Sequence, residues 1–296
     1  MNSVVNDPIS PARLRQAAPA SPVVAGQRSQ GPLGPQRRLC VLQIIPSLDA
    51  GGAERGALDM AGAIYAQGGR ALVASKGGRM QAELAALGGT LIKMPVASKN
   101  PLIMLLNALR LARLVRQHGV DLIHARSRAP AWSAWLAASL TGTPWLTTFH
   151  GFYGADSALK RFYNSIMVRG DRVIAGSHFM AGHIAAVYKP PPQRIVTIAR
   201  GIDVQRFNPD AVEPGRVAAL RRELAIPDGA LVALLPARLT RWKGQLLFIE
   251  ALAKLNRSDV IGVLAGDAQG RDAYEEELWA LAGKLGVANR LRVAGN

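Results

Sequence analysis

Several scarcities in this 296-residue sequence narrow what the protein can be. Its single cysteine excludes a disulfide framework and a cysteine-based zinc site, and it suits a reducing compartment. Aromatic residues make up 5% of the chain, too few for the stacking platforms that bind single-stranded nucleic acid, and no nucleic-acid-binding motif is present. The longest uncharged apolar stretch, Ala129 to Phe149, is interrupted by Thr141-Gly142-Thr143-Pro144. We therefore expect no nucleic-acid partner and no transmembrane helix.

Acidic residues are scarce too, since 20 Asp and Glu stand against 36 Lys and Arg, a net charge of +16. Such an excess favours an anionic partner, such as nucleic acid, phospholipid or a phosphorylated substrate. Of the basic residues, 28 are arginine, whose planar guanidinium suits bidentate contacts to phosphate. A coding bias towards Arg, Ala and Gly explains this composition equally well, so charge alone does not identify the partner.

Residues 1–38 mix Pro, Ala, Ser, Gln and Arg without a continuous apolar segment. They are predicted to form a disordered N-terminal arm and do not resemble a secretion signal. We therefore expect a cytoplasmic protein, and peripheral contact with the inner face of a membrane stays open.

From Leu39 onward, short apolar runs alternate with helical patterns, which predicts βαβ units, a parallel sheet and helices on both of its faces. The strands predicted within residues 39–205 are Leu39–Ile45, Ala71–Ser75, Thr90–Met94, Asp121–His124, Trp145–Phe149, Arg172–Ala175 and Arg194–Ile198. The helices predicted between them are Ala53–Gln67, Gln81–Leu87, Leu102–Gln117, Ala131–Leu140, Leu159–Val168 and His178–Val187. This part of the chain reads as a doubly wound α/β domain.

The alternation of predicted strands and helices begins again within residues 206–296. Helices are predicted at Val217–Leu224, Gln245–Leu255 and Tyr274–Leu285, and strands at Leu231–Leu235, Val260–Leu264 and Leu291–Val293. A doubly wound half usually continues to five or six strands. We therefore expect a second α/β domain that is incomplete.

Ligands of such sheets bind at the carboxyl ends of the strands, so the loops that follow the strands are the places to inspect. Gly51 and Gly52 follow the first strand and open a helix, where bare backbone and free N–H groups favour an anion. The segment lacks the G-x-G-x-x-G spacing, which disfavours a nicotinamide dinucleotide. A plain glycine-rich turn is the alternative.

Two cations, Arg238 and Lys243, lie five residues apart before a helix of the second domain. At a helix N-terminus such a pair neutralises the charge of a leaving diphosphate. A solvated basic loop is the alternative interpretation.

Two histidines and two arginines also follow strands of the first domain: His124, Arg126, Arg128 and His150. A lone histidine is more often structural than catalytic, yet both lie where the sheet rule places a ligand. Arg126 and Arg128 are candidates for holding the phosphate of an acceptor, or are ordinary loop charges.

The predicted helix Leu102–Gln117 has two sides. Asn107, Arg110, Arg113 and Gln117 share one stripe, and the other side carries Leu105, Leu106, Leu109 and Ala112. A core helix with a solvated face is the simpler prediction. The alternative is a basic amphipathic surface that rests on anionic lipid.

Four motifs stand in register along the chain: Gly51-Gly52-Ala53-Glu54-Arg55, Thr148-Phe149-His150-Gly151, Gly201-Ile202-Asp203 with Arg206-Phe207-Asn208-Pro209, and Arg238-x4-Lys243-Gly244. In order and spacing, from about Leu39 to Asn296, they resemble the GT-B retaining glycosyltransferases of family 4. The resemblance implies two Rossmann-like domains facing a cleft, an acceptor-binding one at 39–205 and a donor-binding one at 206–296.

The resemblance also assigns roles. Arg238 and Lys243 would bind the donor's diphosphate, with Gly51 and Gly52 closing over it, and His150 would be the catalytic residue near the reacting sugar. Glu54, His124, Arg126 and Arg128 are the candidate acceptor ligands. The implied reaction is retaining sugar transfer from a nucleotide-diphosphate sugar to a cell-envelope glycan or lipid-linked acceptor. No metal or other cofactor is required, because cationic side chains and a helix dipole supply the positive charge.

One departure from the family pattern concerns a glutamate pair, E-x7-E, that members carry later in the donor domain. Glu275, Glu276 and Glu277 follow the wrong strand and do not match it. We therefore expect a truncated and poorly active form, whose turnover a radiolabelled transfer assay would measure. The alternative is a non-catalytic module that binds an anionic acceptor or a membrane surface, distinguished by lipid binding without nucleotide binding.

Overall fold

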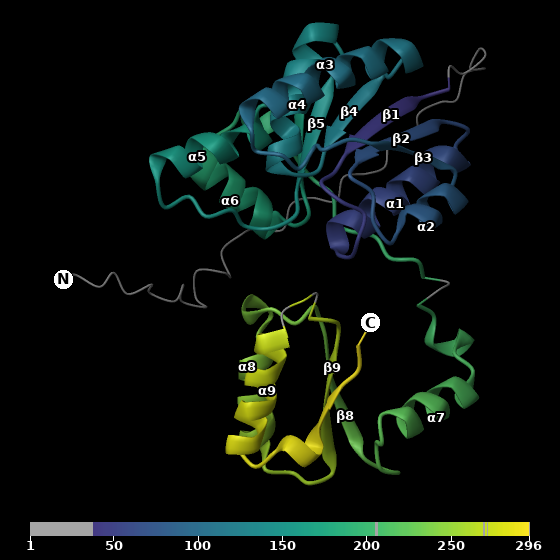
Figure 1. The fold of residues 1–296 in the computed structure, drawn as a ribbon, viewed down its shortest axis with the longest axis vertical. Helices are drawn as coiled ribbons and strands as arrows, with labels where there is room; N and C mark the ends of the chain where they lie inside the picture. Colours follow the sequence, from purple (N-terminus) through teal and green to yellow (C-terminus); the bar gives the residue numbers. More distant parts are fainter. Residues whose placement is uncertain (1–37, 205–206, 269, 271, 296) are drawn as a thin grey trace, which may run out of the picture. The chain divides into compact units, whose positions relative to one another are not determined.

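The computed structural model describes residues 38–204, 207–268, 270 and 272–295 (Figure 1). The predicted N-terminal arm lies outside the described residues except for Arg38, and so does Arg206 of the family motif. The chain divides into two compact units, Met1–Arg200 and Gly201–Asn296. This division falls five residues before the boundary placed after residue 205 by the sequence. Each unit is described by itself.

Within the described part of the first unit, parallel strands form a seven-stranded sheet in the order β3-β2-β1-β4-β5-β6-β7. The strands are β1 (Cys40–Ile44), β2 (Arg70–Ser75), β3 (Gly89–Lys93), β4 (Leu122–Ala125), β5 (Trp145–Phe149), β6 (Arg172–Ala175) and β7 (Ile195–Thr197). Every strand predicted in this unit is present, with its ends within about one residue of the prediction. The doubly wound α/β fold is therefore confirmed here.

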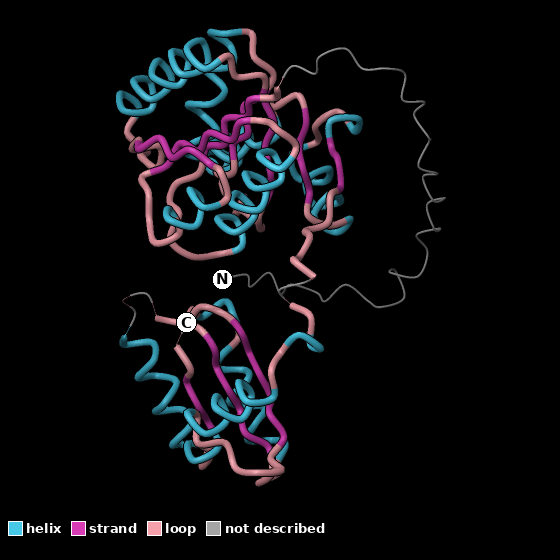
Figure 2. Tube along the Cα trace, turned by 90° about the vertical axis from the view of Figure 1, so that its right-hand side faces the viewer, coloured by secondary structure: helices cyan, strands magenta, loops and turns pink. Residues whose placement is uncertain are grey.

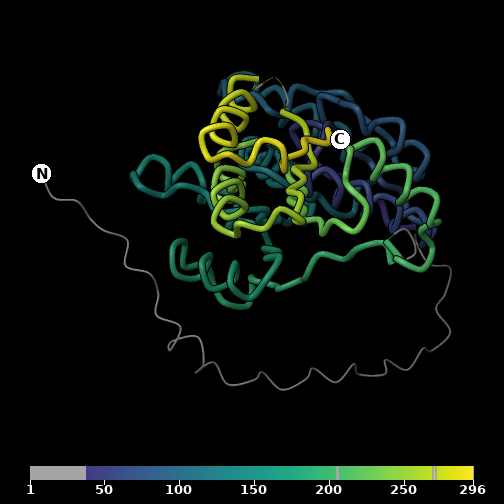
Figure 3. The backbone as a smooth tube through the Cα atoms, turned by 90° about the horizontal axis from the view of Figure 1, so that it is seen from below, coloured from purple at the N-terminus to yellow at the C-terminus, as the bar shows by residue number. Residues whose placement is uncertain are grey.

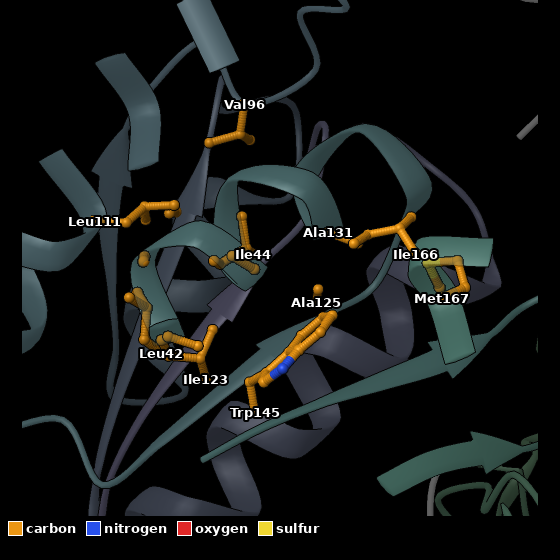
Figure 4. Close-up of a cluster of buried hydrophobic side chains, with 14 of the residues drawn as sticks. Leu42, Ile44, Val96, Leu111, Ile123, Ala125, Ala131, Trp145, Ile166 and Met167 are labelled. Atoms are coloured by element: carbon orange, nitrogen blue, oxygen red, sulfur yellow. The ribbon is translucent and has the colours of Figure 1, made fainter. Parts of the chain in front are cut away.

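Helices cover both faces of this sheet (Figure 2). They are α1 (Gly52–Ala66), α2 (Gln81–Ala86), α3 (Pro101–His118), α4 (Arg128–Thr141), α5 (Ala158–Ser165), η2 (Ile166–Val168), α6 (His178–Tyr188) and η3 (Pro192–Arg194). Because successive side chains of a strand point to opposite faces of the sheet, the residues of β1 pack in two hydrophobic cores. Leu42 and Ile44 pack in the core with α3 and α4 (Figure 4), whereas Val41 packs in the core with α1 and α2.

Helix α3 buries a different side from the one that the sequence predicts. Leu105, Leu106 and Leu109 are 49%, 51% and 52% exposed, whereas Asn107 is fully buried and its Nδ2 donates to the Pro95 carbonyl at 3.0 Å. The buried face contains the small residues Ala108 and Ala112, and α4 buries alanines in turn. Small residues let two helices approach closely, so these three leucines stay outside. The predicted core face was wrong for the leucines and for Asn107, whereas Ala112 is buried and Arg110, Arg113 and Gln117 are exposed as predicted.

The second unit has a three-stranded parallel sheet, in the order β10-β9-β8, within its described residues. Its elements are η4 (Pro209–Ala211), α7 (Pro214–Glu223), β8 (Leu231–Pro236), η5 (Arg241–Lys243), α8 (Gln245–Leu255), β9 (Val260–Ala265), α9 (Asp272–Lys284), η6 (Ala288–Arg290) and β10 (Leu291–Val293). Helices α8 and α9 lie side by side (Figures 1 and 3) and bury a separate core that includes Ile249 and Leu278. On β8, at the sheet's edge, Leu231 and Leu234 are 53% and 56% exposed.

Candidate functional site

Five segments of the first unit end or begin at the carboxyl edge of its sheet, as expected for a parallel sheet. β1 leads to Gly51 and Gly52 at the start of α1, β4 leads to Arg126, β5 to His150 and β7 to Arg200. The structure brings these groups together, because Arg200 approaches both Gly52 and His150, and Arg126 approaches α1. This carboxyl edge is the candidate functional site.

The start of α1 leaves main-chain N–H groups for a ligand. Gly51 is the N-cap with φ 141°, a conformation that favours glycine, and it provides no side-chain cap. A methyl group on Gly51 would lie 2.7 Å from Oε2 of Glu54, whose carboxylate therefore folds back over the helix start. A methyl group on Gly52 would lie 2.5 Å from Nη1 of Arg200. The backbone conformation of Gly51 favours glycine, and a side chain at Gly52 would displace the end of Arg200.

Arg126 is a buried cation, only 5% exposed. Its Nε donates to Oε1 of Gln43 at 2.7 Å, and Nε2 of Gln43 donates to the Ala57 carbonyl at 2.9 Å. Burial and the nearby Arg200 lower the pKa of Arg126 to about 10, so it stays charged at neutral pH. Among the described residues no carboxylate forms an ion pair with it. Since a buried charge is costly without a partner, Arg126 favours an anionic ligand.

The two histidines at this edge are neutral at pH 7. His124 is 3% exposed and its Nε2 lies 2.7 Å from Oγ1 of Thr148. Burial, followed by Arg126 and His150, lowers the pKa of His124 well below its usual value. Burial, Arg126 and Arg200 lower the pKa of His150 to about 3. The positive charge at this edge therefore comes from the two arginines.

Arg128 points to a different place from Arg126. It lines a cavity of about 680 Å³ together with Lys99 and Lys160, between the starts of α3 and α4 and the segment around α5. Its Nη1 donates to Oδ1 of Asn164 at 3.0 Å, and its guanidinium carbon lies 4.4 Å from the ring centroid of Tyr153. Lys160 also pairs with Asp156 at 2.7 Å. The two arginines that the sequence grouped together therefore lie in different surroundings, Arg126 against Gln43 and Arg128 in the wall of this cavity.

In the second unit, Arg238 follows β8 and Lys243 closes η5 just before α8. Gly244 is the N-cap of α8 with φ 83° and offers no side-chain cap, so the first N–H groups of α8 are available. Arg238 is half-buried, and its carbonyl accepts from Nε2 of Gln245 at 2.9 Å. Lys243 is exposed, with Nζ 4.1 Å from the ring centroid of Trp242. Two cations thus flank a helix N-terminus.

The neighbouring acid Glu277 is engaged elsewhere. Its carboxylate forms a bidentate pair with Arg241 at 2.7 and 2.5 Å. This contact anchors Glu277 to the segment just before α8.

Sequence reasoning missed Gln43, Lys99, Lys160 and Arg200. The sequence contains a feature that could have identified Gln43, because it is the one polar residue of the apolar segment 40–45. Arg200 had one too, since it follows the seventh strand, a loop that we did not inspect. No feature of the sequence identifies Lys99 and Lys160, because only the packing of α3, α4 and α5 brings them into one cavity with Arg128.

Solved structures identify the class of protein. A glycosyltransferase from Rickettsia africae is 35% identical, and the match covers 88% of this chain and 69% of that one with a TM-score of 0.78. Anabaena HepE, solved with UDP and glucose, is 24% identical over 87% of this chain and 69% of that one, with a TM-score of 0.74. The two parallel α/β sheets are those of the GT-B glycosyltransferase fold.

The family follows from the sequence match. The pattern of Glycosyltransferase Family 4 matches residues 50–206, more than half of the chain, and the chain belongs to this family. A curated relative, the D-inositol 3-phosphate glycosyltransferase of Segniliparus rotundus, is 26% identical over 185 residues. That match covers 58% of this chain and 40% of the relative, so the chain spans less than half of the relative's length. No described helix is long and apolar enough to cross a membrane.

Proposed function

We propose that the chain acts in the transfer of a sugar from a nucleotide-diphosphate sugar to a cell-envelope glycan or lipid-linked acceptor, with retention of configuration. Membership of family 4 supports sugar transfer, and HepE, which shares the fold, was solved with a nucleotide and a sugar. The single observation that carries the proposal is the buried charge of Arg126 at the carboxyl edge of the first sheet, beside the uncapped start of α1.

For the donor, we assign the diphosphate to Arg238 and Lys243, which flank the uncapped start of α8. By resemblance to the family's glycine motif, we also assign Gly51 and Gly52 to this diphosphate. These groups supply positive charge where the leaving diphosphate becomes more negative, which stabilises the transition state without a metal. By the same resemblance, we assign His150 to a position near the reacting sugar.

For the acceptor, we assign the cavity between the starts of α3 and α4 and the segment around α5. Lys99, Arg128 and Lys160 give its wall a positive charge, and Leu159 and Tyr163 add apolar surface. This lining suits an acceptor that carries a phosphate or another anionic group. The curated relative is named for a phosphorylated acceptor of this kind, D-inositol 3-phosphate.

A membrane-bound acceptor is favoured by the outer face of α3. Leu102, Leu105, Leu106 and Leu109 are 71%, 49%, 51% and 52% exposed there. Arg110, Arg113 and Arg116 are exposed among them, and no acidic residue occurs between Glu83 and Asp121. An apolar surface with interspersed cations suits the headgroup region of an anionic membrane. We therefore propose peripheral contact at the inner face of a membrane, and the same face supports the non-catalytic membrane-binding module as a second candidate.

Calorimetry with UDP-glucose tests the donor assignment on the full chain. We expect binding, and we expect Arg238→Ala and Lys243→Ala each to weaken it about 10- to 100-fold, as for loss of a charge-assisted hydrogen bond. Arg257→Ala removes an exposed arginine of the same unit that pairs with Asp259, and it should leave the affinity unchanged. Sugar-nucleotide binding that is absent, while anionic vesicles still bind, would favour the non-catalytic module. A transfer product with inverted configuration would overturn the retaining assignment.

A further inference from the structure

Arg200 makes two contacts at the candidate functional site. It follows β7, and its Nη2 lies 2.7 Å from Nδ1 of His150. Its Nη1 faces the first residue of α1, so closely that a methyl group on Gly52 would lie 2.5 Å away. The exposed guanidinium is therefore seated between the start of α1 and the imidazole, and it depends on the absence of a side chain at Gly52.

The chemistry of this hydrogen bond decides where the proton of His150 lies. A guanidinium has five N–H donors and no acceptor. Nδ1 of His150 must therefore accept, so it carries no proton. The imidazolium form has donors on both nitrogens and cannot make this bond, which leaves the neutral ring with its proton on Nε2. We propose that Arg200 is a positioning residue that holds His150 neutral, in the tautomer protonated at Nε2.

The surroundings of His150 favour the same state. Burial, Arg126 and Arg200 lower the pKa of its imidazole to about 3. The other titratable groups that face it are His124, whose pKa is well below its usual value, and Tyr153, whose pKa burial raises to about 12. Both are uncharged at neutral pH, so neither stabilises an imidazolium.

The tautomer determines what His150 offers a ligand. Nε2 is buried and has no hydrogen-bond partner among the described residues, so its N–H is an unused donor. A buried donor without a partner is costly, and a ligand oxygen that reaches it removes the cost. On the proposed function, His150 then donates a hydrogen bond to an oxygen of the sugar and transfers no proton. This last step rests on the proposed function, whereas the tautomer does not.

Nuclear magnetic resonance of the full chain, labelled with ¹⁵N in its histidine rings, tests the proposal directly. The nitrogen shifts show which ring nitrogen carries a proton. In the wild type we expect His150 as a single neutral tautomer, protonated at Nε2, with no titration between pH 8 and 5. In Arg200→Ala we expect loss of the single tautomer and a pKa above that of the wild type, because one positive neighbour is gone.

Two further variants separate positioning from a general effect of charge or folding. Gly52→Ala keeps Arg200 but displaces its guanidinium, so it should reproduce the loss of the single tautomer. Arg172→Ala removes an exposed arginine at the start of β6, on the opposite edge of the same sheet, and should change nothing at His150. Arg200→Lys keeps a donor-only head group and should restore the tautomer in part.

The proposal fails if wild-type His150 is protonated at Nδ1, or if it titrates near pH 6.5. It also fails if the tautomer survives both Arg200→Ala and Gly52→Ala. Calorimetry with UDP-glucose distinguishes a failure of the positioning role of Arg200 from a failure of the proposed function. The expected tautomer without any nucleotide-sugar binding would remove the proposed function and leave the positioning role, whereas normal binding with the other tautomer would do the reverse.

Discussion

Arg126 carries a buried positive charge whose surroundings follow from its position just after β4. It follows β4, and packing against Gln43 and α1 buries its charge to 5% exposure with no ion pair among the described residues. Such a charge works against folding and favours anion binding, the usual conflict between stability and function at a binding site. His124 and His150 beside it are kept neutral by the same burial.

Replacing Arg126 by glutamine should separate stability from binding. Arg126→Gln removes the buried charge and leaves a polar group that can still reach Gln43. We expect the free energy of unfolding to rise or to stay within about 1 kcal/mol. Affinity for inorganic phosphate, which stands in for the anionic group of an acceptor, should fall about 10- to 100-fold, since the lost contact is charge-assisted. Urea titration and calorimetry measure the two effects, and a large loss of stability with unchanged affinity would contradict the anion-site assignment.

The pH dependence of stability follows from His150. Its folded pKa of about 3 lies below the usual 6.5, so below pH 6.5 the unfolded chain binds a proton that the folded chain does not. The free energy of unfolding therefore falls as pH decreases from about 6.5 to about 3, by up to about 1.4 kcal/mol per pH unit for this group. His150→Gln should show a shallower decline between pH 6.5 and 4 in urea titrations. Above pH 7.5 the two proteins should share one slope, and equal slopes throughout would contradict the burial of a neutral His150.

At the scale of elements, α3 shows that a helix can be predicted correctly while its buried face is not. Apolar residues occupy most of its circumference, so periodicity alone allows more than one core face. Close packing against the alanines of α4 selects the side with Ala108 and Ala112. The larger leucines are left outside among arginines, which is the arrangement that suits an anionic surface.

Charge reversal on α3 tests that surface. Arg110→Glu with Arg113→Glu should lower co-sedimentation with vesicles that contain phosphatidylglycerol by at least about 10-fold, because each basic residue near such a surface contributes about 1 kcal/mol. The matched control is Arg216→Glu with Arg222→Glu on α7, which makes the same change of net charge at exposed positions of the other unit. Equal losses in both double variants would show that only net charge matters. Neutral vesicles should bind all of these proteins weakly.

At the scale of the whole molecule, the chain consists of two units with separate hydrophobic cores. Within its described residues, the first unit has two hydrophobic cores, one on each face of its sheet, formed by β1 with helices α1 to α4. The second unit has a core formed by β9 with α8 and α9. Units with their own cores usually unfold as separate cooperative blocks. The net charge of +16 lies almost wholly in residues 1–200, where 23 Lys and Arg stand against 8 Asp and Glu, whereas residues 201–296 have 13 against 12. Attraction to anionic partners through net charge is therefore a property of the first part of the chain.

Calorimetric unfolding should therefore show two transitions that core variants move separately. Leu278→Ala opens a cavity in the second core and should lower only one transition, with a destabilisation of about 2–5 kcal/mol. Leu111→Ala does the same in the first unit and should lower only the other. A single transition that both variants shift equally would contradict independent units.

The amino-acid sequence alone determined the order and type of the elements, the parallel sheets and most of the loops at the candidate site, although not the loop that carries Arg200. It could do so because strand and helix patterns, glycines and loop cations are local signals, and parallel strands bring their ends to one edge. Tertiary structure decided which side chains meet. Arg126 and Arg128 diverge because Arg126 directly follows β4 whereas Arg128, two residues later, begins α4. Arg200 reaches His150 across 50 residues of chain. Contacts of that kind depend on packing between distant segments, which no local pattern encodes.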